Sequence, residues 1–206
     1  KIYTHNGSGG LIDFAWDSLT TDQKNYFKVA TIGTSLSQMC TDADNCIPEA
    51  QKKDSTAEGT DTGFGGVNLV NFLRGDRRNE DGTGGKYYFK RTHVLGDIVG
   101  SQAAYVKKST FKYPDLNYAK FKADNETRQG MVYVGANDGM LHAFNADNGA
   151  ESWAYIPSML LPKLYKLADK NYSSNHTYFV NGSPQQGEAY FDDKWHTLLV
   201  GGLSAG

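Results

Sequence analysis

Alternating apolar and polar positions over residues 131–156 give the clearest structural pattern in the chain. The run MVYVGA ends at the NDG triplet of residues 137–139, which suits a tight hairpin because glycine accepts a positive φ. MLHAFN follows as a second strand, a second turn falls at residues 146–149, and ESWAYI forms a third strand before Pro157. This order predicts one blade of a β-propeller or one meander of a sandwich. Within it, we expect Trp153 to be the apolar plug that locks one sheet to the next.

Helical periodicity predicts three short helices elsewhere in the chain. One spans residues 21–30 and is expected to begin with Thr21 as its cap. A second spans residues 67–74, with its apolar residues on one face and Gly75 as the residue that ends it. A third starts near Pro162, because proline is tolerated at the first helical position.

The distribution of strand and loop signals divides the chain into two predicted parts, residues 1–86 and residues 87–206. Residues 1–86 open with the strand-like LIDFAW and include a polar, glycine-rich loop over residues 40–66. Residues 87–106 carry strand signals, and residues 107–129 read as a charged and aromatic surface insertion. The runs TYFVNG, EAYFDD and HTLLVG then start a further sheet. We expect the first part to precede and pack on a propeller, and residues 87–206 to hold its first blades, incomplete at the C-terminus.

Composition narrows the class of protein. Hydrophobic residues make up 39% of the chain and aromatic residues 13%, which supports a packed core. The balance of 21 basic and 23 acidic residues, a net charge of −2, argues against a nucleic-acid binder. No apolar run reaches the roughly 18 residues of a membrane-spanning helix. No signal peptide opens the chain and its last strand lacks a return partner, so we expect a mature or trimmed piece of a larger exported protein.

The only two cysteines lie close together in MCTDADNCIP. In an exported protein, Cys40 and Cys46 predict a local disulfide, and no CxxC or histidine pair accompanies them to form a zinc site. Asp42, Asp44 and Asn45 place three oxygen donors in the same loop and form a weak candidate calcium site. Calcium takes about six to eight oxygens, and the loop lacks the distal glutamate of an EF-hand. The alternative is a solvated acidic loop.

No catalytic constellation emerges from the other polar residues. The histidines are not spaced as metal ligands, and His142, in the middle of a strand, is expected to be a partly buried, hydrogen-bonded ring. The G-x-S-x-G elbow of a hydrolase does not occur. We therefore predict no catalytic residue and no enzymatic activity.

Several motifs resemble one family of bacterial proteins. The run AFNADNGAESW at residues 143–153 is similar to the A-x-D-x-x-T-G-x-x-x-W docking motif of quinoprotein-type β-propellers, with Asn145 in place of Asp and Asn148 in place of Thr. The residues placed in this motif are Ala143, Asn145, Asn148, Gly149 and Trp153. The segments LRGDRRNE, RTHVLGDIVGSQAAYV, WAYIPSMLLPKL, YFVNGSP and WHTLLVGGLSAG resemble PilC/PilY-type proteins, the tip-associated adhesins and assembly factors of type IV pili. This resemblance covers roughly residues 67–206.

The resemblance implies an all-β fold, a quinoprotein alcohol dehydrogenase-like β-propeller with a few short helices. It implies an exported protein at the pilus tip, the cell surface or the outer membrane, which attaches to host cells and supports pilus biogenesis. Its expected partners are minor pilins, the pilus fibre, and a host receptor or matrix. A purely structural assembly factor that opposes retraction is the alternative. The resemblance implies no cofactor in this piece and leaves room for calcium in a full-length propeller. A quinone-dependent dehydrogenase is remote, because the adjacent cysteine pair of those enzymes does not occur.

The tripeptide Arg74-Gly75-Asp76 is a candidate receptor-binding motif. In an extended loop, such a motif presents a guanidinium and a carboxylate to an integrin, and relatives in the PilC/PilY family have been associated with integrin contact. The alternative is structural, with Asp76 accepting hydrogen bonds at a helix-to-loop junction. A tripeptide match alone does not decide between them.

Overall fold

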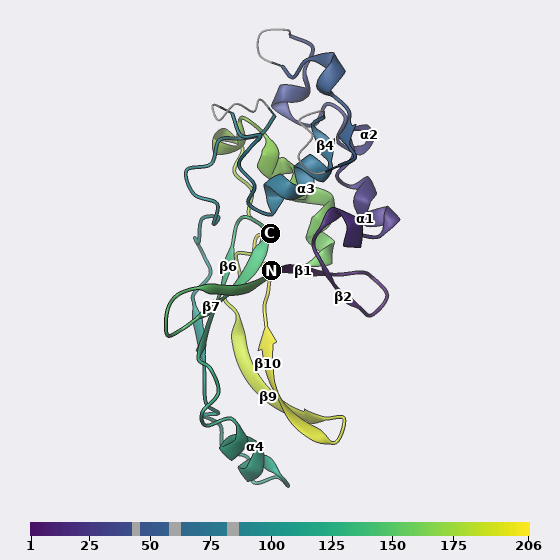
Figure 1. The fold of residues 1–206 in the computed structure, drawn as a ribbon. Coiled ribbons are helices and arrows are strands. Elements are labelled where there is room, and N and C mark those ends of the chain that lie inside the picture. The colour runs from purple at the N-terminus through teal and green to yellow at the C-terminus, as the bar shows by residue number, and fades with distance from the viewer. Residues whose placement is uncertain (43–45, 58–62, 82–86) are drawn as a thin grey trace. The chain divides into compact units, whose positions relative to one another are not determined.

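The computed structural model describes residues 1–42, 46–57, 63–81 and 87–206, which form two compact units (Figure 1). The sheet unit consists of Lys1, Asp97–Tyr155 and Tyr178–Gly206, and the disulfide unit consists of Ile2–Gly96 and Ile156–Thr177. Of residues 1–86, the sheet unit contains only Lys1, and the disulfide unit contains the described remainder together with residues from the second predicted part. The role of residues 1–86 as a segment that precedes and packs on a propeller stays a prediction.

The sheet unit contains an antiparallel sheet in the order β5, β6, β7, β8. These strands span Ala104–Val106, Met131–Ala136, Met140–Asn145 and Glu151–Ile156. The last three strands are those predicted for the blade. Gly139 and Gly149 adopt φ values of 91° and 73° in the two turns, the left-handed region that glycine accepts. The described residues show a sheet with strand order and turns suited to one blade, and no closed ring of blades.

A hairpin completes the strands of the sheet unit. Strands β9 (Gln185–Phe191) and β10 (Lys194–Val200) pair antiparallel along their whole length. Asp192 and Asp193 form the turn with φ values of 50° and 59°, as a two-residue hairpin turn requires. Helix α4 (Tyr118–Asp124) lies inside the 107–129 segment.

Of the predicted strand regions, one is shorter in the structure and another forms no strand. The signals over residues 87–106 yield only β5, because Tyr88 is fully buried in an aromatic cluster of the disulfide unit and does not extend a long strand. The run TYFVNG forms no strand. Its Phe179 is buried, and the Phe179 backbone N–H donates to Asn137 Oδ1 at 3.1 Å.

The disulfide unit combines short strands with short helices. Its strands are β1 (Ile2–His5), β2 (Leu11–Asp13), β3 (Asp54–Ser55) and β4 (Gly65–Gly66). Its α-helices are α1 (Thr21–Asn25), α2 (Val29–Ile32) and α3 (Val67–Leu73). Its 3-10 helices are η1 (Trp16–Ser18), η2 (Ser37–Met39), η3 (Glu49–Gln51), η4 (Ser158–Ala168) and η5 (Tyr172–Ser174). Tyr88 lies at the centre of the core, with its ring 5.2 Å from that of Phe64 and 4.6 Å from that of Phe72.

The structure corrects the predicted helix over residues 21–30. Its cap is Thr20, which exchanges hydrogen bonds with Gln23 in a capping box, and the helix ends at Asn25. Long-range bonds interrupt it: the Phe27 carbonyl accepts from Gly66 N at 2.9 Å, and Val29 N donates to Asp54 Oδ1 at 2.8 Å.

The other two predicted helices are present. Helix α3 agrees with its prediction, and Gly75 follows it with a φ of 109°. The third prediction places its helix start too late. The 3-10 helix η4 begins at Ser158 and contains Pro162 in its interior.

Candidate binding surface

An aromatic cluster joins the 107–129 segment to the β9–β10 hairpin. The Tyr113 ring stacks on Trp195 with centroids 5.2 Å apart and planes 17° apart, and the Tyr118 ring meets the edge of Trp195 at 4.7 Å. Trp195 Nε1 also donates a hydrogen bond to the Leu116 carbonyl at 3.1 Å. We call this cluster the aromatic tip. It consists of Phe111, Tyr113, Leu116, Tyr118, Phe121, Tyr190 and Trp195.

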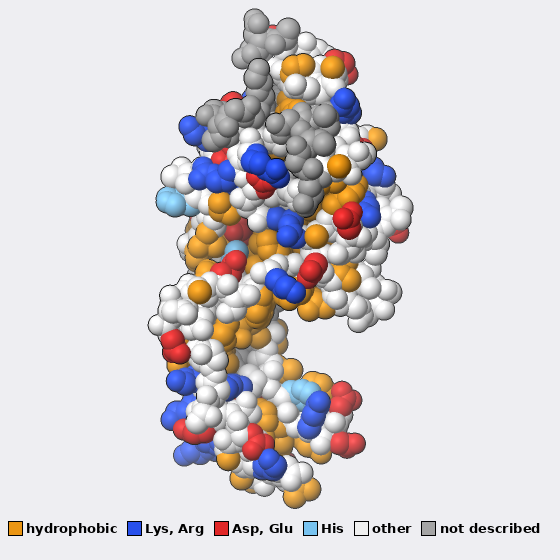
Figure 2. Space-filling model, viewed as in Figure 1, with side chains coloured by type: hydrophobic (Ala, Val, Ile, Leu, Met, Phe, Trp, Pro, Cys, Tyr) orange, Lys and Arg blue, Asp and Glu red, His pale blue; other side chains and the backbone are white. Residues whose placement is uncertain are grey.

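The aromatic tip presents apolar groups to solvent. Leu116 is 82% exposed, Tyr190 49% and Tyr113 38%, while Tyr118 is buried beneath them. Figure 2, viewed as in Figure 1, shows orange hydrophobic side chains among blue and red charged ones around α4 and the β9–β10 hairpin. Grouped exposed apolar side chains on a folded scaffold are typical of protein-binding surfaces.

Buried polar contacts hold the aromatic tip in place. The Tyr118 hydroxyl donates to Glu188 Oε2 at 2.6 Å, and the Ser109 hydroxyl donates to the same oxygen at 2.8 Å. Burial and the hydrogen bond to Glu188 raise the pKa of the Tyr118 hydroxyl above its usual value. Glu188 lies on β9, so these bonds anchor the segment to the hairpin. The aromatic tip is therefore a fixed surface and not a loose loop.

Arg128 fixes the other end of the segment. Its Nη1 donates to Thr197 Oγ1 on β10 at 2.7 Å, and its Nε donates to the Lys107 carbonyl. Because Lys107 follows β5 and Arg128 precedes β6, this side chain ties both ends of the segment to each other and to the hairpin.

His142 lies buried between two carboxylates within the blade. Its Nδ1 is 2.6 Å from Glu151 Oε1 and its Nε2 is 3.1 Å from Asp138 Oδ2, and the residue is 4% exposed. Burial by itself would lower the pKa of His142. The hydrogen bonds and negative charges of Asp138 and Glu151 outweigh that effect and raise its pKa above the usual 6.5. The cluster links the β6–β7 turn to the start of β8, which gives it a structural role in the blade.

The residues of the docking motif occupy β7, the following turn and β8. Asn145 Oδ1 accepts from Asp147 N at 2.8 Å and Asn148 Oδ1 accepts from Ala150 N at 2.9 Å, so both amides shape the turn. Ala143 is fully buried. Trp153 on β8 is the cross-strand partner of Ala143, and its ring centroid lies 5.7 Å from that of Tyr133 in the same sheet. The role of Trp153 between neighbouring sheets stays a prediction.

The structure places Arg74, Gly75 and Asp76 directly after α3, with both charged side chains engaged. Arg74 Nη1 donates to the Phe14 carbonyl, and Asp76 Oδ2 accepts from Arg78 Nε at 2.7 Å. The hydrogen bond and charge of Arg78 lower the pKa of the Asp76 carboxyl. These contacts are those of the structural alternative, and receptor binding by the tripeptide remains a prediction.

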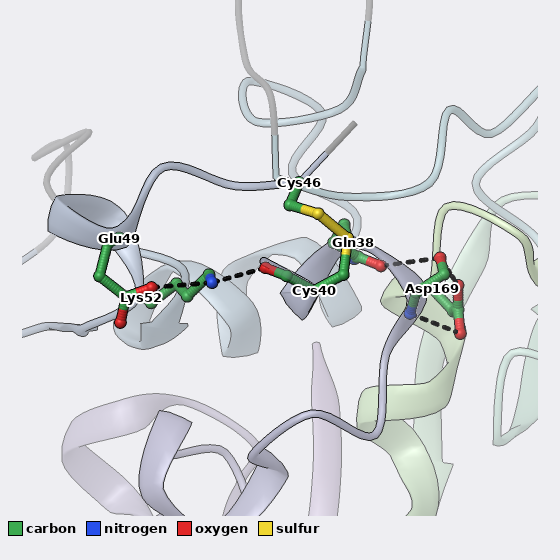
Figure 3. The surroundings of a disulfide bond; sticks show 7 residues. Gln38, Cys40, Cys46, Glu49, Lys52 and Asp169 are labelled. Atoms are coloured by element: carbon green, nitrogen blue, oxygen red, sulfur yellow. Dashed lines mark hydrogen bonds and ion pairs between the residues drawn. A yellow bond between two sulfur atoms is a disulfide. The ribbon is translucent and has the colours of Figure 1, made fainter. Parts of the chain in front are cut away.

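A disulfide joins Cys40 and Cys46, as the sequence predicts (Figure 3). Lys52 Nζ donates to the Cys40 carbonyl at 2.7 Å and pairs with Glu49 at 2.9 Å. Just before the disulfide, the Gln38 side chain donates to the carbonyls of Tyr87 and Ala168 at 2.9 and 2.7 Å. The disulfide thus closes a loop beside a buried amide that joins three segments of its unit.

The remaining sequence candidates concern metals and membranes. Of the weak calcium candidates, Asp44 and Asn45 lie outside the described residues, and Asp42 O accepts the backbone N–H of Cys46. Across the described ranges, no three histidine, cysteine, aspartate or glutamate side chains are grouped to hold a metal ion. None of the helices in those ranges is both long and apolar enough to cross a membrane.

The sequence alone does not reveal the anchors of the aromatic tip. Glu188 is separated from Ser109 by 79 positions and from Tyr118 by 70. The alternation of EAYFDD predicts a strand but not the partner of its buried carboxylate. The aromatic and lysine content of residues 107–129 is the signal that the sequence offers for this candidate surface.

Comparison with known proteins adds a family match. A family model described as the PilY1 beta-propeller domain matches residues 95–206. The type IV pilus biogenesis factor PilY1 of Pseudomonas aeruginosa strain PAO1 is 37% identical over 210 residues, covering 98% of this chain and 16% of that protein. A PilY1 homolog of Xylella fastidiosa strain Temecula1 is 42% identical over 146 residues, covering 66% of this chain and 12% of that protein.

One solved structure is also similar. The crystal structure of the Pseudomonas aeruginosa PilY1 C-terminal domain is 37% identical in sequence and has a TM-score of 0.38, covering 50% of this chain and 20% of that chain. The chain spans 16% of the length of the Pseudomonas relatives that it matches over 98% of its own length.

Proposed function

The chain belongs to the PilY1 β-propeller family, and from that membership we propose that it acts as a binding element in type IV pilus biogenesis. The named relatives are type IV pilus biogenesis factors. In this proposal the protein is exported, lies at the pilus tip or cell surface, and contacts minor pilins and the pilus fibre without covalent chemistry.

The aromatic tip is the observation that carries the proposal. Leu116 and Tyr113 are exposed on a segment that Glu188 and Arg128 fix to the hairpin. Aromatic and aliphatic anchors supply much of the energy of protein interfaces, and a surface held in its bound shape loses less entropy on binding. A pilus component that covers this surface would bury Leu116, which is 82% exposed.

The test replaces Leu116 by Asp in the full-length protein. Surface pili are counted and host-cell adherence is measured in the same bacteria. We expect fewer pili, because a carboxylate at the centre of an apolar contact loses its hydration without gaining a partner. Met159→Asp is the matched control, since Met159 is also a highly exposed apolar residue, at 71%, and lies on η4 of the other unit. Normal pili in Leu116→Asp, with the protein folded and exported, would refute the proposal.

Attachment to a host cell or matrix is the second candidate function, because the same exposed surface suits a foreign partner. Normal pilus numbers with lost adherence in Leu116→Asp would identify this role. The Arg74-Gly75-Asp76 motif is tested separately by two charge-conserving changes. Integrin-type recognition should not tolerate the extra methylene of Asp76→Glu, and Arg74→Lys replaces the planar guanidinium by an ammonium. Unchanged adherence in both variants would exclude this motif as the receptor-binding element.

A further inference from the structure

A pocket of about 450 Å³ lies within the sheet unit, beside β5. Its volume falls in the range of small-ligand sites, roughly 300–1,000 Å³. The residues that line it are Tyr105, Lys107, Lys108, Thr110, Glu126 and Gln186. None of them belongs to the aromatic tip, so the inference drawn from this pocket does not depend on the proposed function.

Tyr105 contributes an exposed aromatic ring to the pocket. The residue is 59% exposed and lies on β5, where it pairs with Val132 of β6. Its ring lies against Gly130: a Cβ at that position would come within 3.0 Å of the Tyr105 hydroxyl and 3.1 Å of its Cε2. The absence of a side chain at Gly130 therefore lets the ring lie where it does. An exposed ring of this kind presents an electron-rich face to C–H groups or cations.

The polar groups around this ring carry a surplus of positive charge. Lys107 and Lys108 contribute two ammonium groups, and Glu126 contributes one carboxylate that pairs with Lys108 at 3.2 Å. Thr110 and Gln186 add a hydroxyl and an amide, each able to donate and to accept hydrogen bonds. Arg128 Nε bonds to the Lys107 carbonyl and so fixes the backbone from which one ammonium extends.

We propose that this pocket binds a sugar residue that bears a carboxylate. A sugar ring has a C–H face that stacks on Tyr105. Its hydroxyl groups exchange hydrogen bonds with Thr110 and Gln186 and donate to the Glu126 carboxylate. Its carboxylate neutralises the surplus charge at Lys107. A simple anion would leave the aromatic face unused, and a neutral sugar would leave the ammonium without a counter-charge.

The experiment is calorimetric titration of the 206-residue chain with three probes: sialyllactose, lactose and inorganic phosphate. We expect sialyllactose to bind at least ten times more tightly than lactose, and phosphate not to displace it at equal concentration. Tyr105→Ala and Lys107→Gln should each weaken sialyllactose binding at least tenfold. Tyr178→Ala and Lys112→Gln are the matched controls, an exposed aromatic residue and an exposed lysine outside both the pocket and the aromatic tip's rings.

Each remaining outcome overturns the assignment. Equal binding of lactose removes the role of the carboxylate, and displacement by phosphate reduces the pocket to a general anion site. Absence of sialyllactose binding, or equal losses in the control variants, removes the site itself. Lys107→Gln removes a charge from a half-buried side chain and leaves β5 unchanged, so it keeps the test decisive if Tyr105→Ala disturbs that short strand. Pilus numbers in Leu116→Asp do not enter this result, which separates it from the proposed function.

Discussion

The hydroxyl of Tyr118 donates a hydrogen bond of 2.6 Å to the buried carboxylate of Glu188. This contact joins helix α4 to strand β9 across 70 positions of the chain. Glu188 is 9% exposed, and a carboxylate so far from water requires such donors. The aromatic tip therefore depends on a polar contact that lies beneath it.

Tyr118→Phe should destabilise the protein by about 1–3 kcal/mol, because it removes one of the donors to a buried charged group. Denaturant unfolding measures the change. Tyr190→Phe is the control, since Tyr190 is half exposed and its hydroxyl can bond to water; its effect should stay within about 0.5 kcal/mol. Equal stability of Tyr118→Phe and the wild type would show that the Glu188 carboxylate does not depend on this bond.

Gly135→Ala should destabilise the sheet unit through overpacking, by about 1–3 kcal/mol. A Cβ at Gly135 on β6 would lie 2.5 Å from the Val180 carbonyl oxygen and 2.9 Å from Val180 Cγ1. Gly187→Ala on β9 is the matched control, because nothing lies within 4 Å of its Cβ position. Thermal unfolding of both variants compares them. A larger loss in Gly187→Ala than in Gly135→Ala would contradict the packing between β6 and residue 180.

The blade could be predicted because its information is local. Alternation sets the strands, and glycine at positions 139 and 149 sets the turns, so the prediction of β6 to β8 is confirmed. The disulfide could be predicted as well, since the sequence offers Cys40 only one other cysteine as a partner.

The predictions fail where contacts with residues distant in the sequence determine the local backbone conformation. Helical periodicity over residues 21–30 is real, but Asp54 and Gly66 bind the backbone of Val29 and Phe27 and divide the helix in two. Tyr88 lies in a region with strand signals, yet burial among aromatic rings determines its place. Neither competing contact has a signature in the local sequence, and the same is true of the pocket at Tyr105, whose lining comes from separate segments.

Replacing both Cys40 and Cys46 by Ser should lower the free energy of unfolding by about 2 kcal/mol, the loop-entropy contribution of a short disulfide. Before that comparison, intact mass under non-reducing conditions should be lower than that of the reduced chain by two hydrogen atoms. Two free thiols in the exported protein would contradict the disulfide. Just outside the loop, Ile47 N donates to the Gln38 carbonyl at 2.8 Å, so hydrogen exchange at Ile47 should quicken in the double variant.

His142 should make the stability of the protein depend on pH above neutrality. Its pKa is raised in the folded state by Asp138 and Glu151, so the folded protein holds the proton more tightly than the unfolded chain does. The stabilisation is then fully present below the unfolded pKa of about 6.5 and is lost as pH rises through the higher folded pKa. Urea unfolding at a series of pH values should show stability falling across that window.

His142→Gln should remove this fall, because glutamine keeps hydrogen-bonding capacity but does not titrate. It should also lower stability at pH 6, where the imidazolium lies between the two carboxylates. His93→Gln provides the control, since His93 is exposed and lies outside the blade; its pH profile should follow that of the wild type. A wild-type profile that stays flat or rises between pH 6.5 and the folded pKa would show that the two carboxylates do not hold His142 in its charged form.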